Sequence, residues 1–358
     1  MSFKIMLLSS HFYFSKKRAG FHHLADEYLK KGFEVVFVTV PYSFLKLFGL
    51  DGKISQTFFV RNIFLRIKRS NLTSIINFSL THPTTKNLWN DRLYGFFINK
   101  RVLKEVIGLD FIIFESNASL YFFEKIKKVN PSARLIYRVS DDLLAIGVQK
   151  SLVKQEERVL NDFDIVSVPN ELIYRRLYEK SPGNIFLHHH GVDFSIFDNE
   201  KANPYAIGTV NAVFVGNSHF DHTFLEVASR LFRKVDFHII GNVPKKIQKV
   251  NVLYYDEIPF SDTIKFIKFA DIGLQARAGD SALLGTLANS NKVEQYLYCG
   301  LPIIAPVEIN TINSNFFLYE RNEKSISSCI DRALSHEFSD LETDVNSWEW
   351  VAKELVGI

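Results

Sequence analysis

The chain has 358 residues, of which 47% are hydrophobic and 23% charged, with a formal net charge of +4. This length corresponds to about two domains at roughly 150 residues each, and the composition is that of a globular protein with sizeable cores. Its two cysteines, Cys299 and Cys329, exclude a disulfide scaffold and fit a reducing cytoplasm, and the lack of an apolar run of about 18 residues predicts no membrane span. The first apolar stretch, 3–8, is interrupted by Lys4 and ends at Ser9-Ser10-His11, so we expect a buried strand there and not a signal peptide.

Short apolar runs alternate with amphipathic helical stretches along the whole chain. In the first half they predict strands at 4–9, 34–40, 110–115, 134–140 and 164–168, and helices at 21–31, 120–128 and 152–160. The segment 41–90 fits this alternation poorly, so we expect an irregular insertion there. After residue 205 they predict strands at 212–215, 236–240, 252–255, 271–275 and 302–305, and helices at 223–232, 262–269 and 291–298.

Continuous apolar strands separated by helices are typical of parallel sheets that are buried on both faces. Because the alternation restarts after a polar segment near 198–205, we predict an α/β protein with two doubly wound, Rossmann-like domains. Their expected bounds are 1–195 and 205–338.

The basic charge is concentrated in residues 41–104. Eleven Lys and Arg residues stand there against two acids, which gives +9, so the rest of the chain carries −5 (+4 minus +9). This basic segment is also rich in Phe and Leu, a combination that can dock on anionic lipid. A solvated basic face above core phenylalanines is an equal alternative, and we expect no nucleic-acid partner.

Polar residues follow the predicted strands repeatedly. Ligands of open α/β sheets bind beyond the carboxyl ends of the strands, so these residues predict a site in a cleft. They are Ser9-Ser10-His11, Glu115-Ser116, Ser140-Asp141-Asp142, Gly216-Asn217, Gly241-Asn242 and Asp256-Glu257. Taken singly, each is also compatible with an ordinary loop or helix cap.

Asp141 is the best candidate for a general base. It directly follows an apolar strand, where partial burial raises the pKa of a carboxyl toward the useful range. The adjacent Asp142 is a rival, and a helix N-cap is the structural alternative for Asp141.

Two features of the second half fit a phosphate-binding role. The backbone N–H groups of Gly216-Asn217-Ser218, between a strand and a helix, can receive a phosphate, and Lys292 at the start of a helix can offset a diphosphate. The alternatives are that the loop at Gly216, which lacks a complete GxGxxG motif, binds no phosphate, and that Lys292 is an ordinary exposed lysine. His188-His189-His190 predict no metal site, because consecutive residues of an extended segment point to opposite faces.

Two motifs resemble those of GT-B glycosyltransferases. His190-Gly191-Val192-Asp193, with Phe197 four residues on, resembles the junction of their domains, and 292–296 followed by 300–305 resembles their donor-site helix and next strand. Residues 347–352 resemble the closing helix that returns to the first domain, so we expect this helix within 339–358.

A longer similarity, from about residue 8 to 306, is to glycosyltransferase family 70, to which the glucuronosyltransferase of xanthan assembly belongs. It is densest in 113–116, 129–131, 135–141, 215–216, 237–241, 263–268 and 290–296. The resemblance implies a GT-B fold, in which two Rossmann-like domains face each other across a cleft.

The resemblance also implies roles for single residues. Asp141 falls on the family's catalytic base, and Lys292 and Gln295 fall on residues that hold the donor, with Lys292 at its diphosphate. Glu257 matches an acid of the nucleotide pocket, and Ile258 matches a residue that packs on the base.

Gly216 and Asn217 fall in the loop that faces the nucleotide. Arg18-Ala19 and His22 match a motif on the acceptor side of the cleft, where we also expect His11 and Glu115. Two residues of the donor side depart from the family. Asn291 replaces an apolar residue, and Arg277 stands where the family has a tyrosine. These differences allow a donor with another base or sugar. Alternatively, Arg277 can pair with the carboxylate of a uronic acid.

The expected function is therefore inverting transfer of a sugar, with glucuronic acid as one candidate, from a UDP-sugar to a lipid-linked oligosaccharide in bacterial surface polysaccharide assembly. Asp141 would be the base, no metal or other cofactor would be needed, and the chain would act in the cytoplasm on the inner face of the plasma membrane.

The alternatives are a retaining family-4-like GT-B glycosyltransferase and a non-catalytic sugar-nucleotide-binding partner of the same fold. The glutamate pair typical of family 4 is absent, since Leu287 and Gln295 stand at its positions. A nicotinamide-dependent oxidoreductase is more distant, because the glycine fingerprint and its ribose-binding acid are missing.

Overall fold

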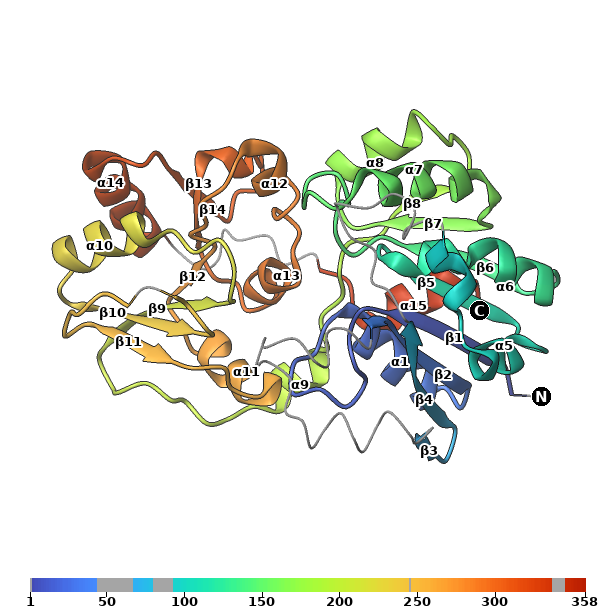
Figure 1. Ribbon diagram of the computed structural model, residues 1–358. Coiled ribbons are helices and arrows are strands. Elements are labelled where there is room, and N and C mark those ends of the chain that lie inside the picture. The colour runs from blue at the N-terminus through green and yellow to red at the C-terminus, as the bar shows by residue number, and fades with distance from the viewer. Residues whose placement is uncertain (1, 44–66, 80–92, 245, 337–344) are drawn as a thin grey trace. The chain divides into compact units, whose positions relative to one another are not determined.

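The chain folds into two compact units in a computed structural model that describes residues 2–43, 67–79, 93–244, 246–336 and 345–358. Unit 1 comprises Met1–His188 with Trp348–Ile358, and unit 2 comprises His189–Ser347 (Figure 1). The sequence placed the divisions near 195 and 339, whereas the units divide after His188 and after Ser347.

Unit 1 is built on an eight-stranded sheet with the order β3-β4-β2-β1-β5-β6-β7-β8. Neighbouring strands are parallel, apart from the antiparallel pair β3 and β4. The strands are β1 (Lys4–Ser9), β2 (Glu34–Ser43), β3 (Ile67–Arg69), β4 (Leu72–Ser79), β5 (Phe111–Glu115), β6 (Arg134–Arg138), β7 (Ile165–Val168) and β8 (Ile185–Leu187). The chain winds outward from β1 in one direction and from β5 in the other, so these two strands form the switch point where such sheets bind ligands.

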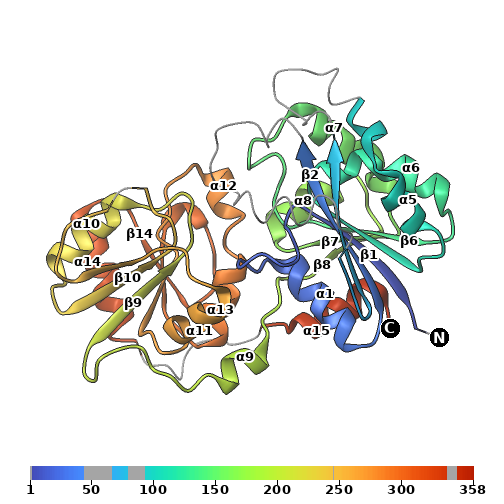
Figure 2. The ribbon, with the colours of Figure 1, turned by 60° about the horizontal axis from the view of Figure 1, so that its bottom comes forward.

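Helices cover both faces of this sheet, as Figure 2 shows. Successive side chains of a strand point to opposite faces. Met6 and Leu8 of β1 therefore lie in one core and Ile5 and Leu7 in the other. The helices on the first face are α5 (Lys100–Val106), α6 (Phe123–Val129), α7 (Lys150–Val159) and α8 (Glu171–Tyr178), and those on the second are α1 (Gly20–Lys30) and α15 (Trp348–Val356). Short 3₁₀ turns are η1 (Gly95–Phe97), η2 (Ala118–Phe122) and η3 (Leu160–Asp162).

The expectation of an irregular insertion at 41–90 is wrong for the part that the structure describes. β2 continues to Ser43, and β4 pairs with it in parallel as a member of the main sheet. The polar side chains of Thr73, Ser74 and Asn77 are buried in β4, and these obscure its apolar pattern. Residues 44–66 and 80–92 lie outside the described residues.

The C-terminal helix α15 belongs to unit 1, although the chain reaches it from unit 2. It packs on α1, where the Tyr28 hydroxyl donates a hydrogen bond to the backbone carbonyl of Ala352 at 3.0 Å. The rings of Trp348 and His23 stack at 5.3 Å between centroids. A helix therefore forms within the predicted 339–358 segment and completes the core of the first unit.

Unit 2 contains a six-stranded parallel sheet with the order β11-β10-β9-β12-β13-β14. Its strands are β9 (Val210–Val215), β10 (Val235–Ile240), β11 (Val252–Tyr255), β12 (Ile272–Leu274), β13 (Ile303–Pro306) and β14 (Phe316–Tyr319). The strand order reverses between β9 and β12, so the carboxyl ends of these two strands form the switch point of unit 2.

Two cores again lie on the two faces of the sheet. α10 (His222–Leu231) and α14 (Glu323–Leu334) contribute to one core, and α9 (Phe194–Asn199), α11 (Phe260–Lys268) and α13 (Asn291–Tyr298) to the other. The remaining elements are α12 (Ser281–Gly285) and η4 (Val307–Ile309). A Cβ on Gly273 of β12 would lie 2.7 Å from the Tyr296 ring, so this glycine lets α13 pack closely on the sheet.

Candidate functional site

Glu115 joins the carboxyl ends of β1, β5 and β6 in unit 1. Its side chain is 4% exposed and accepts hydrogen bonds from the hydroxyls of Ser9, Ser10 and Ser140, each at 3.0 Å. The backbone N–H of Ser10 and the amide of Asn117 donate to the same carboxylate at 2.6 and 3.0 Å. Glu115, which we expected on the acceptor side, is therefore a buried residue that holds three strand ends together.

Ser116 holds the backbone that follows β6. Its hydroxyl oxygen accepts hydrogen bonds from the backbone N–H groups of Ser140 at 3.0 Å and of Asp141 at 3.1 Å. The polar residues that the sequence predicts at the ends of β5 and β6 thus lie together at one edge of the sheet.

Asp141 combines a fixed backbone with an accessible carboxylate. Its side chain is exposed, and it has no hydrogen-bond or ion-pair partner among the residues that the structure describes. The surrounding protein desolvates the carboxylate and the negative charge of Glu115 acts in the same direction, so the pKa of Asp141 is raised above its ordinary value, while His11 partly offsets this rise. A water-accessible carboxylate with a raised pKa is suited to accept a proton near neutral pH.

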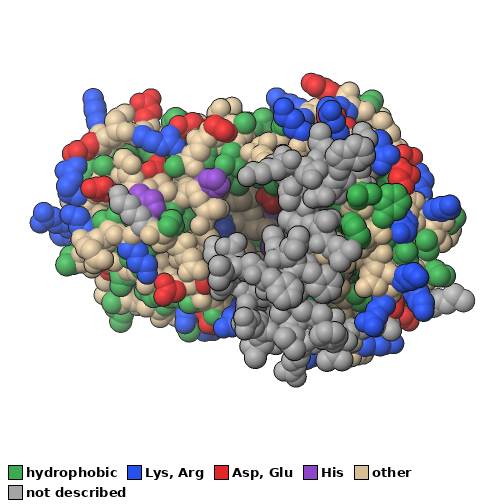
Figure 3. All heavy atoms as spheres, viewed as in Figure 1, with side chains coloured by type: hydrophobic (Ala, Val, Ile, Leu, Met, Phe, Trp, Pro, Cys, Tyr) green, Lys and Arg blue, Asp and Glu red, His purple; other side chains and the backbone are tan. Residues whose placement is uncertain are grey.

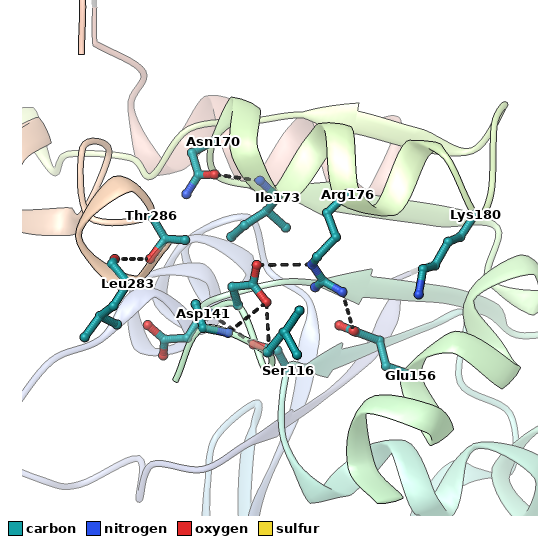
Figure 4. A network of polar contacts seen from close by, with 12 residues as sticks. Ser116, Asp141, Glu156, Asn170, Ile173, Arg176, Lys180, Leu283 and Thr286 are labelled. Carbon is teal, nitrogen blue, oxygen red and sulfur yellow. Dashed lines mark hydrogen bonds and ion pairs between the residues drawn. The ribbon is translucent and has the colours of Figure 1, made fainter. Parts of the chain in front are cut away.

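Asp142 is engaged in a different role, which separates it from Asp141. It is 6% exposed, and its carboxylate accepts a hydrogen bond from the Leu144 backbone N–H at 2.9 Å and forms an ion pair with Arg176 at 3.1 Å. Figure 4 shows Arg176, the ion-pair partner of Asp142, together with Asp141. Of the two neighbouring acids, only Asp141 has a carboxylate that is both accessible and without a partner within the described residues. Because this carboxylate accepts no backbone N–H there, Asp141 is not a helix N-cap.

The residues expected on the acceptor side lie at the end of β1 and the start of α1. His22 is fully buried, and burial is the main cause that lowers its pKa to about 4. Its Nδ1 accepts a hydrogen bond from the Ala19 backbone N–H at 3.0 Å, and its Nε2 lies 2.9 Å from the Phe12 carbonyl oxygen. His22 therefore shapes the loop before α1 and cannot contact a ligand directly in this conformation.

Arg18 and His11 remain partly exposed at the same place. Arg18 forms an ion pair with Asp26, whose carboxylate also accepts a hydrogen bond from the Tyr13 hydroxyl at 2.6 Å. The His11 and His22 rings lie 5.7 Å apart, and His11 acts electrostatically on Asp141. His11 is thus a partly exposed acceptor-side residue whose charge affects the pKa of the candidate base, Asp141.

In unit 2, the loops after β9 and β10 approach each other closely. The Asn217 side-chain oxygen accepts a hydrogen bond from the Asn242 backbone N–H at 2.8 Å. A Cβ on Gly241, whose φ is +123°, would lie 2.3 Å from the Gly216 carbonyl oxygen, so only glycine allows this contact.

The helix that follows Gly216-Asn217-Ser218 begins only at His222, and the Asp221 carboxylate caps it by accepting a hydrogen bond from the Phe224 N–H at 3.0 Å. The Asp221 carboxylate therefore serves the helix itself, and the phosphate-binding role of the Gly216-Asn217-Ser218 backbone stays a prediction for the loop before it.

Arg277 lies directly under the Gly216 loop. Its guanidinium donates hydrogen bonds to the Ser218 carbonyl oxygen at 2.6 Å and to the Gln275 side-chain oxygen at 3.2 Å. A Cβ on Gly216 would lie 2.9 Å from one of its terminal nitrogens. No carboxylate pairs with Arg277 among the described residues, so a buried positive charge supports this loop from beneath.

Lys292 is the second cation at this edge of unit 2. Burial lowers its pKa, and the positive charge of Arg277 adds to the effect, bringing the value to about 8. In the described part of the chain its ammonium group has no ion-pair partner. Two cations that repel each other and lack a facing acid form a place where an anion would be stabilised.

Helix α13 carries Lys292 together with two further donor-side candidates. The side-chain oxygens of Asn291 and Gln295 are buried and have no hydrogen-bond partner within the described ranges. The Gln275 amide donates to the Leu287 carbonyl oxygen at 3.1 Å and to the Ser290 hydroxyl at 3.2 Å, so it ties the start of α13 to the end of β12. Buried polar atoms without partners are rare in native proteins and are typical of ligand sites.

Glu257 and Ile258 follow β11 at the same edge of the sheet. The Glu257 side chain is exposed, whereas Ile258 is half-buried against the core that contains α11 and α13. The His188-His189-His190 segment belongs to no cluster of three or more potential metal ligands, a statement that holds for the described residues.

Comparisons with known proteins show sequence relatives and the fold. Residues 7–169 match the family described as "Glucuronosyltransferase GumK, N-terminal domain". Over 340 residues the chain is 28% identical to the UDP-glucuronate:glycolipid 2-beta-glucuronosyltransferase of Xanthomonas campestris pv. campestris, covering 92% of this chain and 83% of that enzyme. A glycosyltransferase structure from Rickettsia africae ESF-5 is similar with a TM-score of 0.60 at 13% identity, covering 99% of this chain and 93% of that one.

The E. coli trehalose-6-phosphate structure bound with UDP-2-fluoro glucose matches with a TM-score of 0.63 at 12% identity, covering 99% of both chains. The chain is a GT-B glycosyltransferase. The structural similarities show the fold, and the sequence matches carry the assignment as an enzyme that transfers a sugar.

Sequence reasoning did not predict the roles of several residues that organise the site of this glycosyltransferase. Ser116 and Gln275 fix backbone or a helix start, and Arg176 holds Asp142 from α8. A signal for α8 was present, because Asn170 is a typical N-cap and Ile173 and Leu177 are spaced four apart. The sequence places Ser116 at a strand end, but no local signal marks its role or that of Gln275, because both roles depend on contacts between distant segments.

Proposed function

We propose that this glycosyltransferase transfers a glucuronosyl group from UDP-glucuronate to a hydroxyl group of a glycolipid, with inversion at the anomeric carbon. The similarity to the Xanthomonas glucuronosyltransferase supports this donor and acceptor class, because that enzyme is named for both. The single observation that carries the proposal is the accessible carboxylate of Asp141, which is unpaired within the described residues and whose pKa is raised.

Unit 2 binds the nucleotide diphosphate in this proposal. Lys292 and Arg277 provide two positive charges that lack carboxylate partners among the described residues. A diphosphate between them would relieve their mutual repulsion and would stabilise the negative charge that develops on the leaving group. The buried Gln295 oxygen, which lacks a hydrogen-bond partner in the described residues, offers an acceptor for a hydroxyl or N–H group of the donor.

Unit 1 provides the base. Asp141 takes the proton from the acceptor hydroxyl while that oxygen attacks the anomeric carbon, and the bond to the diphosphate breaks in the same displacement. A positioned general base contributes roughly 10²–10⁴-fold to such a step. The proposal thus assigns the base to unit 1 and the charges that stabilise the leaving diphosphate to unit 2, and it requires no metal ion.

The donor sugar is open to a direct test, because Asn291 and Arg277 differ from the residues we expect of the family. We expect UDP-glucuronate to support transfer and to bind more tightly than UDP-glucose in a titration of the purified protein. Equal binding and transfer with UDP-glucose would remove the uronate from the proposal but would leave Asp141 and the diphosphate site in place.

The stereochemistry separates the two reaction classes. Nuclear magnetic resonance of the product formed from an α-linked UDP-sugar should show a β-linkage. An α-linkage would favour a retaining mechanism and would end the role of Asp141 as the base in a single displacement. Absence of both transfer and donor hydrolysis would favour a non-catalytic nucleotide-sugar-binding partner.

The glycolipid acceptor implies contact with a membrane surface, which we propose for the described part of the basic segment. Leu93 and Phe96 are exposed hydrophobic residues of this segment, Ile107 is exposed just beyond its end, and Lys100, Arg101 and Lys104 lie close to them in sequence. Figure 3 shows hydrophobic side chains gathered on unit 1 with Lys and Arg side chains near them. Apolar residues among basic ones suit the interface of an anionic bilayer.

Among the described residues, no helix combines the length and apolar character that crossing a membrane requires. We expect the protein to sediment with liposomes that contain anionic lipid at low salt, and to do so less after Phe96→Asp. Equal recovery of both proteins in the supernatant would contradict peripheral docking through this surface.

A further inference from the structure

A closed network of polar contacts supports the segment that carries Asp141. It begins at Tyr137 on β6, whose hydroxyl donates a hydrogen bond to Glu156 of α7 at 2.6 Å. Glu156 pairs with Arg176 of α8 at 3.2 Å, and Arg176 pairs with Asp142 at 3.1 Å. Since Asp142 lies only five residues after Tyr137 in the chain, the contacts form a ring that returns to the segment directly after its starting strand. Figure 4 shows the pairing of Arg176 with Glu156 in this network.

Asp142 is the point at which this ring meets the backbone next to Asp141. One oxygen of its carboxylate pairs with the Nε of Arg176, and the other accepts the Leu144 backbone N–H at 2.9 Å. The turn is closed by a hydrogen bond from the Ile146 N–H to the Asp142 carbonyl oxygen at 3.0 Å. The Asp142 side chain therefore determines the direction of the backbone immediately after the candidate base.

Arg176 itself is held firmly. It lies on α8, whose start is capped by the Asn170 side chain accepting the Ile173 N–H at 2.9 Å. Its partner Glu156 is 0% exposed, and burial raises the pKa of that carboxyl while Arg176 lowers it. A guanidinium that donates to two carboxylates in a fixed fork is a geometry that lysine cannot reproduce.

We propose that Arg176 is a positioning residue for the transfer reaction, acting through Asp142 to hold the Asp141 backbone in its working direction. The inference rests on the proposed role of Asp141 as the base. Ser116 fixes the Asp141 backbone N–H on one side, and the pairing of Arg176 with Asp142 fixes the following residue on the other. Displacing a catalytic group by about 1 Å can cost about 10²-fold in rate, so this second anchor bears on turnover.

The first test measures transfer by Arg176→Met and Asp142→Asn. We expect kcat to fall by about 10- to 100-fold in each, with the donor KM within about twofold of the starting protein, because neither residue belongs to unit 2. In Asp142→Asn the new amide oxygen would still accept the Leu144 N–H, but the negative charge would be lost, so this variant remains informative even where Arg176→Met fails to fold. Arg176→Lys should recover part of the lost kcat, since an ammonium can still pair with Asp142.

The second test combines the two substitutions. If Arg176 acts through Asp142, the double variant should have a kcat close to that of the poorer single variant, because the second substitution removes nothing further. Fully multiplied losses in kcat would show that the residues act independently and would overturn the inference.

The control is Glu156→Gln, which removes the charge of the second carboxylate that pairs with Arg176 and leaves the pairing of Arg176 with Asp142 intact. We expect a lower melting temperature in circular dichroism and a kcat within about twofold. A loss of kcat as large as that of Arg176→Met would mean that the network only stabilises unit 1, and would contradict positioning. A second control, Lys127→Met, removes the surface pair with Asp162 (2.8 Å) and should change neither quantity appreciably.

Asp141→Asn in the same assay separates the inference from the function on which it depends. If Asp141→Asn is inactive while Arg176→Met and Asp142→Asn keep kcat within about twofold, the positioning role is wrong and the base stands. If Asp141→Asn turns over normally, the base itself is wrong and the positioning role falls with it.

Discussion

The Ser116 hydroxyl accepts a hydrogen bond from the backbone N–H of Asp141 at 3.1 Å. The same oxygen accepts the N–H of Ser140 at 3.0 Å, so one side chain at the end of β5 holds two successive peptide groups after β6. The Asp141 carboxylate makes no such contact within the described residues and stays accessible. The backbone of the candidate base is thus fixed, while its carboxylate is left for the acceptor.

Ser116→Ala should lower kcat by about tenfold with little change in the donor KM. Two backbone N–H groups lose their acceptor, which costs on the order of 1–3 kcal/mol in stability and loosens the placement of Asp141. Steady-state kinetics and thermal melting check both effects. The matched control is Ser132→Ala, which removes a hydroxyl that donates to Asn130 at 2.9 Å before β6, and an equal loss of kcat in that variant would contradict a specific role for Ser116.

Lys292 should make nucleotide binding dependent on pH. In the free protein its pKa is lowered to about 8, so the ammonium loses its proton as the pH rises through that value. Anion binding favours the protonated form, so UDP affinity should weaken steadily above about pH 8. Isothermal titration of UDP between about pH 7 and about pH 9.5 measures this change.

Lys292→Arg serves as the control for this titration, because a guanidinium stays protonated throughout the range. Its UDP affinity should be nearly flat with pH, whereas Lys292→Met should bind weakly at every pH. A pH profile of Lys292→Arg that matches that of the unsubstituted protein would assign the titration to another group.

Glu115→Gln should move the acidic limb of the kcat/KM profile to lower pH. The Glu115 charge is one cause of the raised pKa of Asp141, so its removal lets Asp141 lose its proton at lower pH. The rate near neutral pH should fall at the same time, because the amide cannot accept all the hydrogen bonds that the carboxylate accepts. An acidic limb that shifts upward would contradict this sign.

Transfer should continue when divalent metal ions are removed. The two cations of the donor side, Lys292 and Arg277, supply the positive charge that the leaving diphosphate requires. We expect activity in excess EDTA to equal that in magnesium within about twofold. Loss of activity in EDTA with recovery on adding Mg²⁺ or Mn²⁺ would show that these cations are insufficient.

Much of the fold could be predicted from the sequence, because local patterns determine it. The helix Asn291–Tyr298 and the strand Val252–Tyr255 have the bounds that the sequence predicts, and both show strong apolar spacing. Strand β4 (Leu72–Ser79) was missed because buried polar side chains interrupt its apolar pattern. Its place beside β2 depends on pairing between distant segments, which no local pattern encodes.

The sequence predicts the site residues that lie at strand ends. It predicts less well the residues whose roles depend on contacts between distant segments. The residue pattern alone leaves Asp142 as a rival of Asp141 for the role of base, and the family resemblance is what favours Asp141. Arg176, 34 residues after Asp142, engages that carboxylate and leaves Asp141 unpaired within the described residues. Likewise the burial of His22 and the position of Arg277 beneath Gly216 follow from packing.

The most direct test of the account is the turnover of Asp141→Asn, measured with UDP-glucuronate and a glycolipid acceptor. The substitution keeps the shape of a side chain that has no partner among the described residues, so the fold and the UDP affinity should be unchanged. We predict a fall in kcat of about 10²–10⁴-fold, the range that a general base contributes. A kcat within about tenfold of the starting value, in a folded variant that binds UDP normally, would contradict the role of Asp141 as the base.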